Sequence, residues 1–332
     1  MTDNLTMAKA LEPQALAALE QYDLPQPESL ELLTFSENAV FRADLQDRPP
    51  VVVRLHSLGY HVPAEIESEL MWIQALRRDG AVVTAGILRA RDGRQVVTAS
   101  HSSLADRHAV VFEHLSGQEP EATSLVRDFR LLGHTTALMH GHAISWQLPP
   151  AFERFSWDLA GTLDRSGHWG DWRRGPNLDQ STRNLLDRAA SVVTDRLRVY
   201  GTDPLRYGLI HADLRLANLL LDGPLVKVID FDDCGFGWFM YDLASALTFI
   251  EDDPRVPELV SSWLDGYREV RPLEVTDEEE IPTFLMLRRL VILAWLGSRP
   301  GTELVAKLGP EYARVTADLA ENYLSKKSHA WR

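Results

Sequence analysis

The spacing of apolar residues changes once along this chain, close to Gly117, and that change limits the folds it can adopt. Before Gly117, most apolar residues fall in short alternating or β-branched runs, which predict strands. The first three runs are spaced as an antiparallel meander, and the full set is 30–36, 39–45, 50–56, 81–90 and 108–115. After Gly117, apolar residues recur every three or four positions, which predicts helices. A β-rich part followed by a largely helical part is therefore expected.

Helices are expected both before and after Gly117. Residues 13–22 and 63–78 have helical spacing, and the second begins with Pro63, as suits the first turn of a helix. Beyond Gly117, helices are expected at 128–143, at 181–201 and, with breaks, from Tyr241 onward; a segment rich in Trp, Gly and Pro at 144–180 should hold helix pieces and loops. These patterns predict an α+β chain with a cleft between an N-lobe at 1–115, β-rich with one long helix, and a helical C-lobe at 116–332.

Composition excludes several classes of partner. With 332 residues, the chain is longer than one compact domain usually is. Its formal net charge of −14 argues against nucleic acid or an anionic membrane surface as a main partner, because both need clustered Lys and Arg. Cys234 is the only cysteine, so no intramolecular disulfide can form. A soluble, cytoplasmic protein is expected, because the chain shows no signal peptide and no long apolar run.

One otherwise apolar stretch, residues 208–233, carries His211, Asp213, Asn218 and Asp230. Asp213 and Asn218 are five positions apart in an expected loop, and Asp230 follows 12 positions later, after a strand-like run. Carboxylate and amide oxygens are hard ligands that suit Mg²⁺ better than Zn²⁺. If Asn218 and Asp230 bind the metal, Asp213 is left to accept the proton of a hydroxyl group that attacks phosphorus.

Three short motifs in this region resemble a known family. They occur in order over 34 residues: His211-Ala-Asp213-Leu-Arg215-Leu-Ala-Asn218, Ile229-Asp230-Phe231-Asp232 and Tyr241-Asp242-Leu243-Ala244. Together they are similar to the catalytic loop, the metal-binding strand and the following helix of the aminoglycoside phosphotransferase and choline kinase family, in the protein-kinase-like superfamily. The resemblance implies a bilobal kinase-like fold and a kinase that moves the γ-phosphoryl group of ATP to a hydroxyl group, with ATP and Mg²⁺ as cofactors. It also implies roles for Asp213 and Arg215 in catalysis and for Asn218 and Asp230 in metal binding.

The resemblance further implies nucleotide contacts in the N-lobe. Arg54 takes the place of the lysine that usually holds the phosphates, with Glu69 as its expected partner and Glu65, one turn earlier, as the alternative. The turn between the first two strands lacks the usual glycines, and Asn38 is expected near the phosphates. Backbone groups of Glu113 and Leu115 are expected to face adenine.

Several residues have two readings. His211 is expected to be a buried hydrogen-bonding strut, and Asp242 a brace that caps its helix or accepts backbone amides of the catalytic loop. Arg215 either neutralises charge on the transferred group or makes an ordinary surface contact. Asp232 and Asp233 are left open between a second metal, a cationic group of the acceptor and a solvated turn.

The acceptor class also stays open. A small hydroxyl compound such as an amino alcohol, a hydroxy amino acid or an aminoglycoside is favoured, because the resembling family acts mostly on these. Its cleft would be enclosed by residues 144–180, where Trp157, Trp169 and Trp172 are either core or candidate walls. The alternatives are a protein Ser/Thr kinase of the bacterial stress-response type and a non-catalytic nucleotide-binding scaffold.

Overall fold

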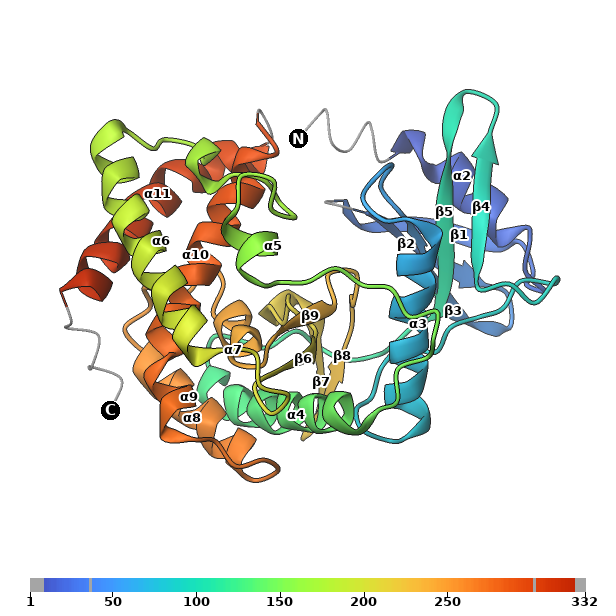
Figure 1. Cartoon of the computed structure of the whole chain (residues 1–332). Coiled ribbons are helices and arrows are strands. Elements are labelled where there is room, and N and C mark those ends of the chain that lie inside the picture. Colours follow the sequence, from blue (N-terminus) through green and yellow to red (C-terminus); the bar gives the residue numbers. More distant parts are fainter. Residues whose placement is uncertain (1–8, 36–37, 301–302, 326–332) are drawn as a thin grey trace. The chain divides into compact units, whose positions relative to one another are not determined.

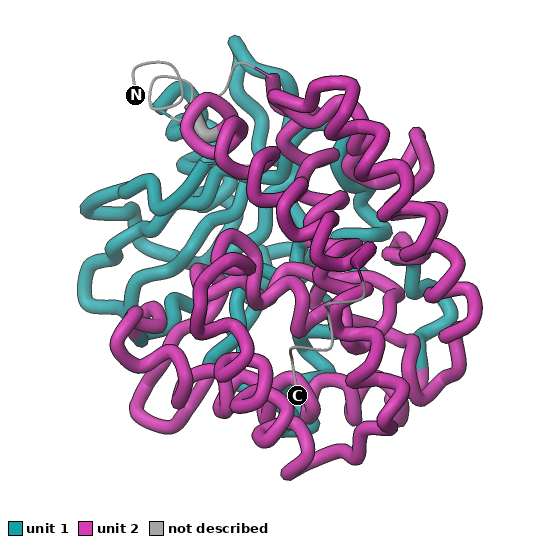
Figure 2. Tube along the Cα trace, turned by 90° about the vertical axis from the view of Figure 1, so that its left-hand side faces the viewer, with its two compact units in different colours: residues 1–117, 148–154, 227–232 teal, residues 118–147, 155–226, 233–332 magenta. Residues whose placement is uncertain are grey.

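The computed structural model describes residues 9–35, 38–300 and 303–325 (Figure 1). These residues fall into two compact units, coloured separately in Figure 2. Unit 1 comprises residues 1–117, 148–154 and 227–232, and unit 2 comprises 118–147, 155–226 and 233–332. Unit 1 therefore includes two short segments that lie beyond the boundary expected at residue 115.

Unit 1 is built on one antiparallel sheet, with strand order β1-β2-β3-β5-β4. Its strands are β1 (Pro27–Phe35), β2 (Ala39–Leu45), β3 (Arg48–Leu55), β4 (Val96–His101) and β5 (Leu104–Glu113). The first three strands pair in sequence order, so the expected meander is confirmed. With the helices of unit 2, this sheet also confirms the α+β, kinase-like fold class.

The two faces of β3 carry different residues because side chains alternate along a strand. Val51, Val53 and Leu55 are buried in a core that includes residues of α2 (Glu12–Leu19). Arg54 lies between them in sequence and points to the other face, where its partner Glu69 is on α3 (Pro63–Arg78). The Arg54 side chain therefore contacts α3 on one face of the sheet, while its apolar neighbours in β3 pack into the core on the other face.

The bounds of α3 agree with the sequence prediction at both ends. Pro63 stands in the first turn, and the Glu65 side chain accepts a hydrogen bond from the Val62 backbone N–H at 3.0 Å. This bond satisfies a donor that the first turn of a helix leaves without an intrahelical partner. Asp79 and Gly80 follow the last helical residue, and Gly80 has a φ of 65°, which a glycine adopts without strain.

The strand predicted at 81–90 is wrong. This segment makes only isolated bridges, Val83 with Lys227 and Ile87 with Phe112, and the remaining strand of the sheet is β4 at Val96–His101. The apolar composition of residues 81–90 suggested a strand. A segment becomes a strand of a sheet only if it pairs along its length with a neighbouring strand, and the spacing of apolar residues does not show whether such a neighbour exists. In β4 only Val97 and Ala99 are buried, so its short alternation is easily missed.

Unit 2 is mainly helical. Its elements are α4 (Leu125–Ser145), α5 (Leu159–Leu163), η1 (Trp172–Arg174), α6 (Gln180–Tyr200), β6 (Tyr207–Ile210), η2 (Leu216–Asn218), β7 (Leu219–Asp222), β9 (Gly235–Trp238), α7 (Met240–Ala246), α8 (Val256–Arg268), α9 (Val275–Glu279), α10 (Ile281–Gly297) and α11 (Glu303–Leu324). Strand β8 (Leu225–Val228) pairs with β7 and contains the point where the chain passes from unit 2 to unit 1. Helix α9 ends at Glu279 and α10 begins at Ile281, so one of the expected breaks lies here; Pro282 stands in the first turn of α10, where a missing N–H is tolerated.

Helices α4 and α8 pack closely because each has a glycine at the crossing. A Cβ atom at Gly133 would lie 2.0 Å from the carbonyl oxygen of Trp263, and one at Gly266 would lie 1.9 Å from that of Arg130. Neither distance is possible for a real side chain, so both positions require glycine. This contact fixes the position of α4 against α8, and α4 includes the buried residue His140.

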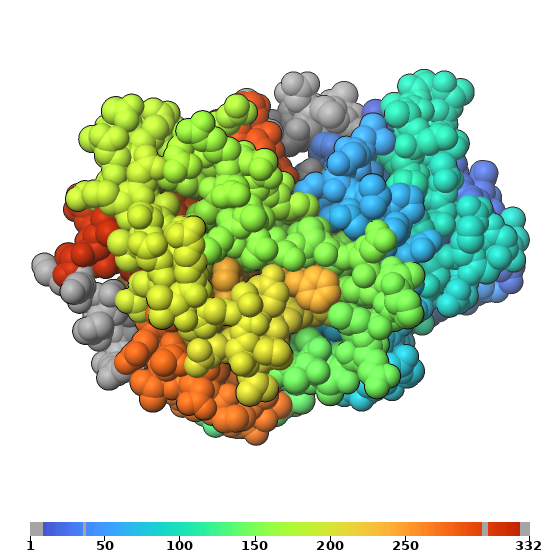
Figure 3. Space-filling view, viewed as in Figure 1, coloured from blue at the N-terminus to red at the C-terminus, as the bar shows by residue number. Residues whose placement is uncertain are grey.

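The segment between α4 and α6 is the expected mixture of short helices and loops, and it forms part of the surface shown in Figure 3. Its three tryptophans, however, are buried: Trp157, Trp169 and Trp172 have exposed fractions of 0%, 7% and 1%. The Trp157 and Trp169 rings are 5.0 Å apart and meet edge to face. These rings are therefore core of unit 2, which was the first of their two readings.

Among the described residues, no helix is both long enough and apolar enough to cross a membrane.

Candidate active site

The expected catalytic loop, residues 211–218, follows the short strand β6, which pairs antiparallel with β9. After Ile210 the chain turns sharply, and Ala212 has a φ of 66°. An alanine with positive φ costs free energy because its Cβ crowds the backbone, so surrounding contacts must hold it. The loop conformation is thus maintained by its neighbours, not by its own sequence preference.

Asp242 on α7 supplies much of that support. Its Oδ2 accepts the His211 backbone N–H at 3.1 Å, and its Oδ1 accepts the Ala212 backbone N–H at 2.7 Å. Asp242 is fully buried, where charge-assisted hydrogen bonds of this kind are strongest. The prediction that Asp242 braces the loop through backbone amides is confirmed.

A further chain of hydrogen bonds reaches Asp242 from α4 and α8. His140 Nε2 lies 3.1 Å from Asp242 Oδ2, and His140 Nδ1 lies 2.9 Å from the Tyr267 hydroxyl. Arg271 donates to the same hydroxyl. Burial lowers the pKa of His140, although its hydrogen bond to Asp242 acts in the opposite direction. A neutral His140 that donates from Nε2 and accepts at Nδ1 satisfies every member of this chain.

The loop also has internal support. His211 is fully buried, and its Nδ1 accepts the Asp213 backbone N–H at 3.3 Å. The Leu214 backbone N–H donates to Ser245 Oγ at 3.0 Å. His211 is therefore the hydrogen-bonding strut that its position in an apolar stretch predicted.

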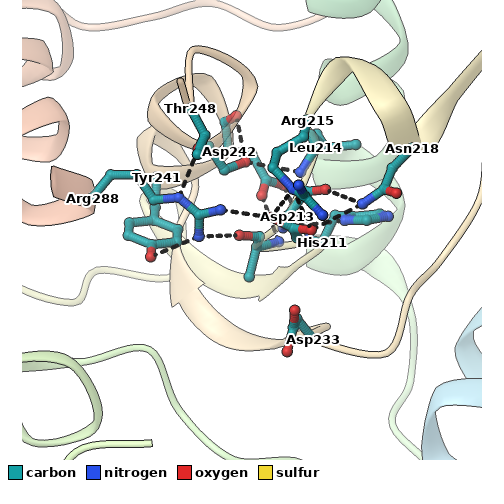
Figure 4. A network of polar contacts seen from close by, with 12 residues as sticks. His211, Asp213, Leu214, Arg215, Asn218, Asp233, Tyr241, Asp242, Thr248 and Arg288 are labelled. Atoms are coloured by element: carbon teal, nitrogen blue, oxygen red, sulfur yellow. Dashed lines mark hydrogen bonds and ion pairs between the residues drawn. The ribbon is translucent and has the colours of Figure 1, made fainter. Parts of the chain in front are cut away.

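The Asp213 carboxylate lies at the centre of a polar network in unit 2 (Figure 4). Arg288 Nη2 is 2.6 Å from Asp213 Oδ1, and Arg215 Nε is 3.1 and 3.0 Å from Oδ1 and Oδ2. Asn218 Nδ2 completes the set at 3.0 Å from Oδ2. Burial raises the pKa of Asp213, but the charges of Arg215 and Arg288 outweigh it and hold the pKa below its ordinary value. The carboxylate is therefore ionised and able to accept hydrogen bonds from a hydroxyl group.

Asn218 is oriented by the same loop. Its amide nitrogen donates to both the backbone oxygen of Asp213, at 2.8 Å, and the carboxylate. Because the nitrogen is held by Asp213, the amide oxygen is directed away from this carboxylate. An amide oxygen of fixed direction is what a hard divalent cation would need from this residue.

In unit 1, Arg54 and Glu69 form a buried ion pair. Arg54 Nη2 lies 2.8 and 2.7 Å from the two carboxylate oxygens of Glu69, and the side chains are 4% and 0% exposed. Arg54 Nη1 also lies 3.5 Å from Asp230 Oδ1. The alternative partner, Glu65, instead caps α3 and lies 3.3 Å from His61 Nδ1. The structure thus brings together Arg54, Glu69 and Asp230, which the sequence placed far apart.

Asp232 is an internal charge of unit 1. Its oxygens lie 3.4 Å from His56 Nδ1, 3.6 Å from His61 Nε2 and 3.9 Å from Arg54 Nη1, and the residue is 4% exposed. Burial raises its pKa, but His56, His61 and Arg54 together hold it well below its ordinary range. A solvated turn is therefore excluded for Asp232. Asp233 belongs to unit 2, where its backbone oxygen accepts the Trp157 indole N–H at 2.8 Å.

The remaining expected nucleotide contacts also lie in unit 1. Asn38 Oδ1 accepts the Ser57 backbone N–H at 3.1 Å, which ties the start of β2 to the residues after β3. The Glu113 backbone N–H donates to Gly86 O at 2.7 Å, so this N–H already has a partner within the protein. Leu115 follows two residues after the end of β5. Their contacts with nucleotide stay predictions.

Comparison with known proteins decides the family. A family model described as the phosphotransferase enzyme family matches residues 32–273, which is most of the chain. The chain belongs to this family. Among curated proteins, the chain is similar to the amicoumacin kinase of Bacillus subtilis (strain 168), which is 26% identical over 297 residues, covering 86% of this chain and 84% of that protein. A homoserine kinase of Pseudomonas aeruginosa (strain LESB58) is 28% identical over 235 residues, covering 68% of this chain and 66% of that protein.

Solved structures of the family agree. A structure described as the microcompartment-associated aminopropanol kinase is 43% identical, with a TM-score of 0.86, and the match covers 97% of this chain and 98% of that one. A structure described as an amicoumacin kinase in complex with AMP-PNP, Ca²⁺ and Ami has the same fold, with 21% identity and a TM-score of 0.74 over 96% of this chain and 94% of that one. This phosphotransferase is accordingly a small-molecule kinase that transfers a phosphoryl group from ATP to a hydroxyl group.

One residue of the site was missed by sequence reasoning. Arg288 on α10 is fully buried and is held against the Asp213 carboxylate. It lies 75 positions from Asp213, beyond the three family-like motifs. The available signal was the pair Arg288-Arg289 inside an otherwise apolar helix, because two adjacent buried charges require partners. The sequence did not indicate which partners those are.

Proposed function

We propose that this phosphotransferase phosphorylates the hydroxyl group of a small amino alcohol and uses Mg²⁺ with ATP. The observation that carries the proposal is the 43% identity with an aminopropanol kinase over 97% of the chain. The homoserine and amicoumacin kinases differ more in sequence, which leaves the amino alcohol as the first acceptor to test. A hydroxy amino acid is the second candidate, because several homoserine kinases match as well.

The proposed transfer starts at Asp213. Its ionised carboxylate orients the acceptor hydroxyl and takes its proton as the oxygen forms a bond to the γ-phosphorus. The bond between that phosphorus and the bridging oxygen breaks, and ADP leaves. Arg215 is about one-third exposed, with 31% of its side chain accessible, while its Nε stays on Asp213. We assign it the additional role of contacting the transferred phosphoryl group, where a fixed cation lowers the barrier.

Separate residues are proposed for the metal and for the nucleotide. Asn218 and Asp230 are the proposed Mg²⁺ ligands, because both offer oxygen atoms and neither is a soft ligand. Among the described residues, no group of three or more His, Cys, Asp or Glu side chains is arranged to hold a metal. When bound, Mg²⁺ would neutralise phosphate charge. Arg54, positioned by Glu69, is assigned to the phosphates, with Asn38 near them and the backbones of Glu113 and Leu115 at adenine.

Asp233 is the proposed partner of the acceptor's ammonium group. Figure 4 shows its side chain beside the Asp213 network in unit 2. Burial is the main reason that the pKa of Tyr241 is raised; among the smaller contributions, the Asp233 carboxylate also raises it, so this charge acts within the network region. A carboxylate near the base would favour a hydroxyl compound that also carries a cation.

The test is ATP consumption by the purified protein with Mg²⁺, with 1-amino-2-propanol, ethanolamine, homoserine, an aminoglycoside and a generic protein as acceptors. Turnover of an amino alcohol, with the phosphate ester identified by ³¹P NMR, supports the proposal. Asp233→Asn should raise the KM for the amino alcohol and leave the KM for ATP unchanged. Turnover of homoserine alone would replace the amino alcohol by the second candidate.

The matched control for the ammonium contact is a substrate. 1,2-Propanediol keeps a hydroxyl group and lacks the amine, so it should be a poor acceptor for the wild type. Asp233→Asn should not worsen its KM further. An equal loss with both acceptors would show that Asp233 acts on the fold of the site and not on the amine.

A further inference from the structure

Each of the three nitrogen atoms of the Arg288 guanidinium donates to a hydrogen-bond acceptor. Nη2 donates to Asp213 Oδ1 at 2.6 Å, Nη1 donates to Ala212 O at 3.0 Å and to the Tyr241 hydroxyl at 3.2 Å, and Nε donates to Thr248 Oγ1 at 2.9 Å. All three nitrogen atoms are thus bonded, and the side chain has no exposed surface. A planar group held at three nitrogens cannot rotate without breaking several bonds.

Two of these acceptors belong to the catalytic loop itself. Arg288 holds the backbone oxygen of Ala212, the residue with positive φ, and the side chain of Asp213, the next residue. The other two, Tyr241 and Thr248, lie on and just after α7, which also carries the brace Asp242. Arg288 therefore connects α10 to the loop and to α7 at one point.

The two arginines on Asp213 differ in exposure to solvent. Arg288 is fully buried, whereas 31% of the Arg215 side chain is exposed. Arg288 also makes the shorter contact with the carboxylate, 2.6 Å compared with 3.0 Å. A buried arginine that is bonded at all three nitrogen atoms keeps its partner in one orientation.

We propose that Arg288 is a positioning residue of the kinase reaction: it fixes the direction of the Asp213 carboxylate. The proposal rests on the proposed role of Asp213 as base. Arg288 does not touch ATP or acceptor. Its effect is on the geometry of proton transfer, where a displacement of about 1 Å costs on the order of 100-fold in rate.

The experiment compares Arg288→Lys with Arg289→Lys. Arg289 is the next residue of α10 and is also buried, at 2% exposed, but it pairs with Glu251 at 2.9 Å and bonds Thr316 and the Tyr312 backbone oxygen. Both variants keep one positive charge and lose a buried planar group, so their melting temperatures should fall by similar amounts. Arg288→Lys should lower kcat about 100-fold with the KM for ATP unchanged, whereas Arg289→Lys should keep kcat within about threefold of wild type.

A double variant separates positioning from a general loss of structure. In the Asp213→Asn background, Arg288→Lys should cause no further loss of kcat, because the group that it positions is already disabled. Equal kcat losses in Arg288→Lys and Arg289→Lys, or full additivity with Asp213→Asn, would overturn the proposal. A rise in the KM for ATP that accounts for the whole effect would overturn it as well.

Thr248→Val keeps the test decisive if Arg288→Lys does not fold. Valine has nearly the shape of threonine and removes the acceptor of Arg288 Nε alone, so kcat should fall about 3- to 10-fold while the protein stays folded. A folded Thr248→Val with wild-type kcat would contradict the proposal. All variants are assayed with whichever acceptor the wild type uses, or by ATP hydrolysis with water as acceptor. Failure of the amino alcohol therefore bears on the proposed function and not on Arg288.

Discussion

Asp213 and Asp230 both belong to the motifs that resemble the kinase family, yet the surroundings of their side chains differ. The Asp213 side chain is 8% exposed and is held by Arg288 at 2.6 Å, whereas the Asp230 side chain is 43% exposed and lies 3.5 Å from Arg54. A buried carboxylate with short bonds keeps one orientation, which suits a base that must meet one proton. An exposed carboxylate with a longer ion pair can exchange its partner for a cation from solution. The environment, and not the residue type, distinguishes the two proposed roles.

Both acids also lie at strained backbone. Asp230 itself has a φ of 61°, and Ala212, just before Asp213, has a φ of 66°. At Ala212 the strain is opposed by two hydrogen bonds: the Ala212 N–H donates to Asp242, and Arg288 donates to the Ala212 carbonyl oxygen. Non-glycine residues with positive φ cost about 1 to 3 kcal/mol and persist where their surroundings impose them, often at functional sites. The comparison between these two segments leads to four tests.

The largest effect is expected for the two acids themselves. Asp213→Asn should lower kcat by about 10²- to 10⁴-fold and leave nucleotide affinity close to wild type, because only the proton acceptor is lost. Asp230→Asn should also lower kcat but should raise the Mg²⁺ concentration needed for half-maximal rate. Steady-state kinetics with Mg²⁺ titration and calorimetric nucleotide binding measure both. The distinction between base and metal ligand fails if both variants show the same Mg²⁺ dependence.

A second test changes the partner of Arg54. Glu69→Gln leaves a buried arginine without its main counter-charge and should destabilise the protein by about 3 to 5 kcal/mol in urea denaturation. Arg54 would then pair more strongly with Asp230 and compete with Mg²⁺ for that carboxylate. The variant should therefore also need more Mg²⁺ for activity.

The matched control is Glu65→Gln, one turn earlier on α3. Glu65 caps the helix and is 24% exposed, so the cost should be about 1 kcal/mol and the Mg²⁺ requirement should not change. If the two variants lose equal stability, the Arg54–Glu69 pair is not the organising contact of this face.

A third test uses pH to examine the support beneath Asp213. Burial lowers the pKa of His140, so this ring is neutral in the folded protein at a pH where the unfolded chain, with a histidine pKa near 6.5, takes up a proton. Stability from this group is present above about pH 6.5 and is lost as pH falls below that value. His140→Gln should therefore show a smaller drop in melting temperature between pH 7.5 and 5.5 than wild type. An unchanged drop would remove His140 from the acid sensitivity of the fold.

The smallest effect is expected for Arg77→Ala, away from both acids. Arg77 and Glu113 form an ion pair at 2.9 Å, but their side chains are 46% and 55% exposed. Such pairs contribute less than about 1 kcal/mol, so chemical denaturation should shift little. The KM for ATP should also stay near wild type, because the expected adenine contact of Glu113 is through its backbone. A several-fold rise in that KM would show that the Glu113 side chain helps to position the nucleotide.

Local patterns were enough to predict much of the fold and part of the site. The helix at 63–78 and the meander of β1 to β3 follow from capping residues and alternation, which are properties of neighbouring residues. The strut His211 and the brace Asp242 followed from the need of buried polar groups for partners. The Arg54–Glu69 pair followed from the family resemblance, with Glu65 as the open alternative.

Features that depend on distant pairing could not be predicted. Residues 81–90 have strand-like composition, but whether they join a ladder depends on which edge lies beside them. Asp232 was left open because its neighbours His56 and His61 come from the beginning of the chain. Arg288 is the clearest case, since a helical pattern shows that a charge is buried and does not show which carboxylate it meets.

The contact between Arg288 and Asp213 also has a consequence for protein synthesis. The catalytic loop is made 75 residues before the arginine that completes its network, and a chain grows from its N-terminus. A nascent chain that has not yet reached α10 holds Asp213 with Arg215 and Asn218 only. The hydrogen-bond network around Asp213 is therefore completed only late in translation, after the sheet of unit 1 and the loop itself have been made.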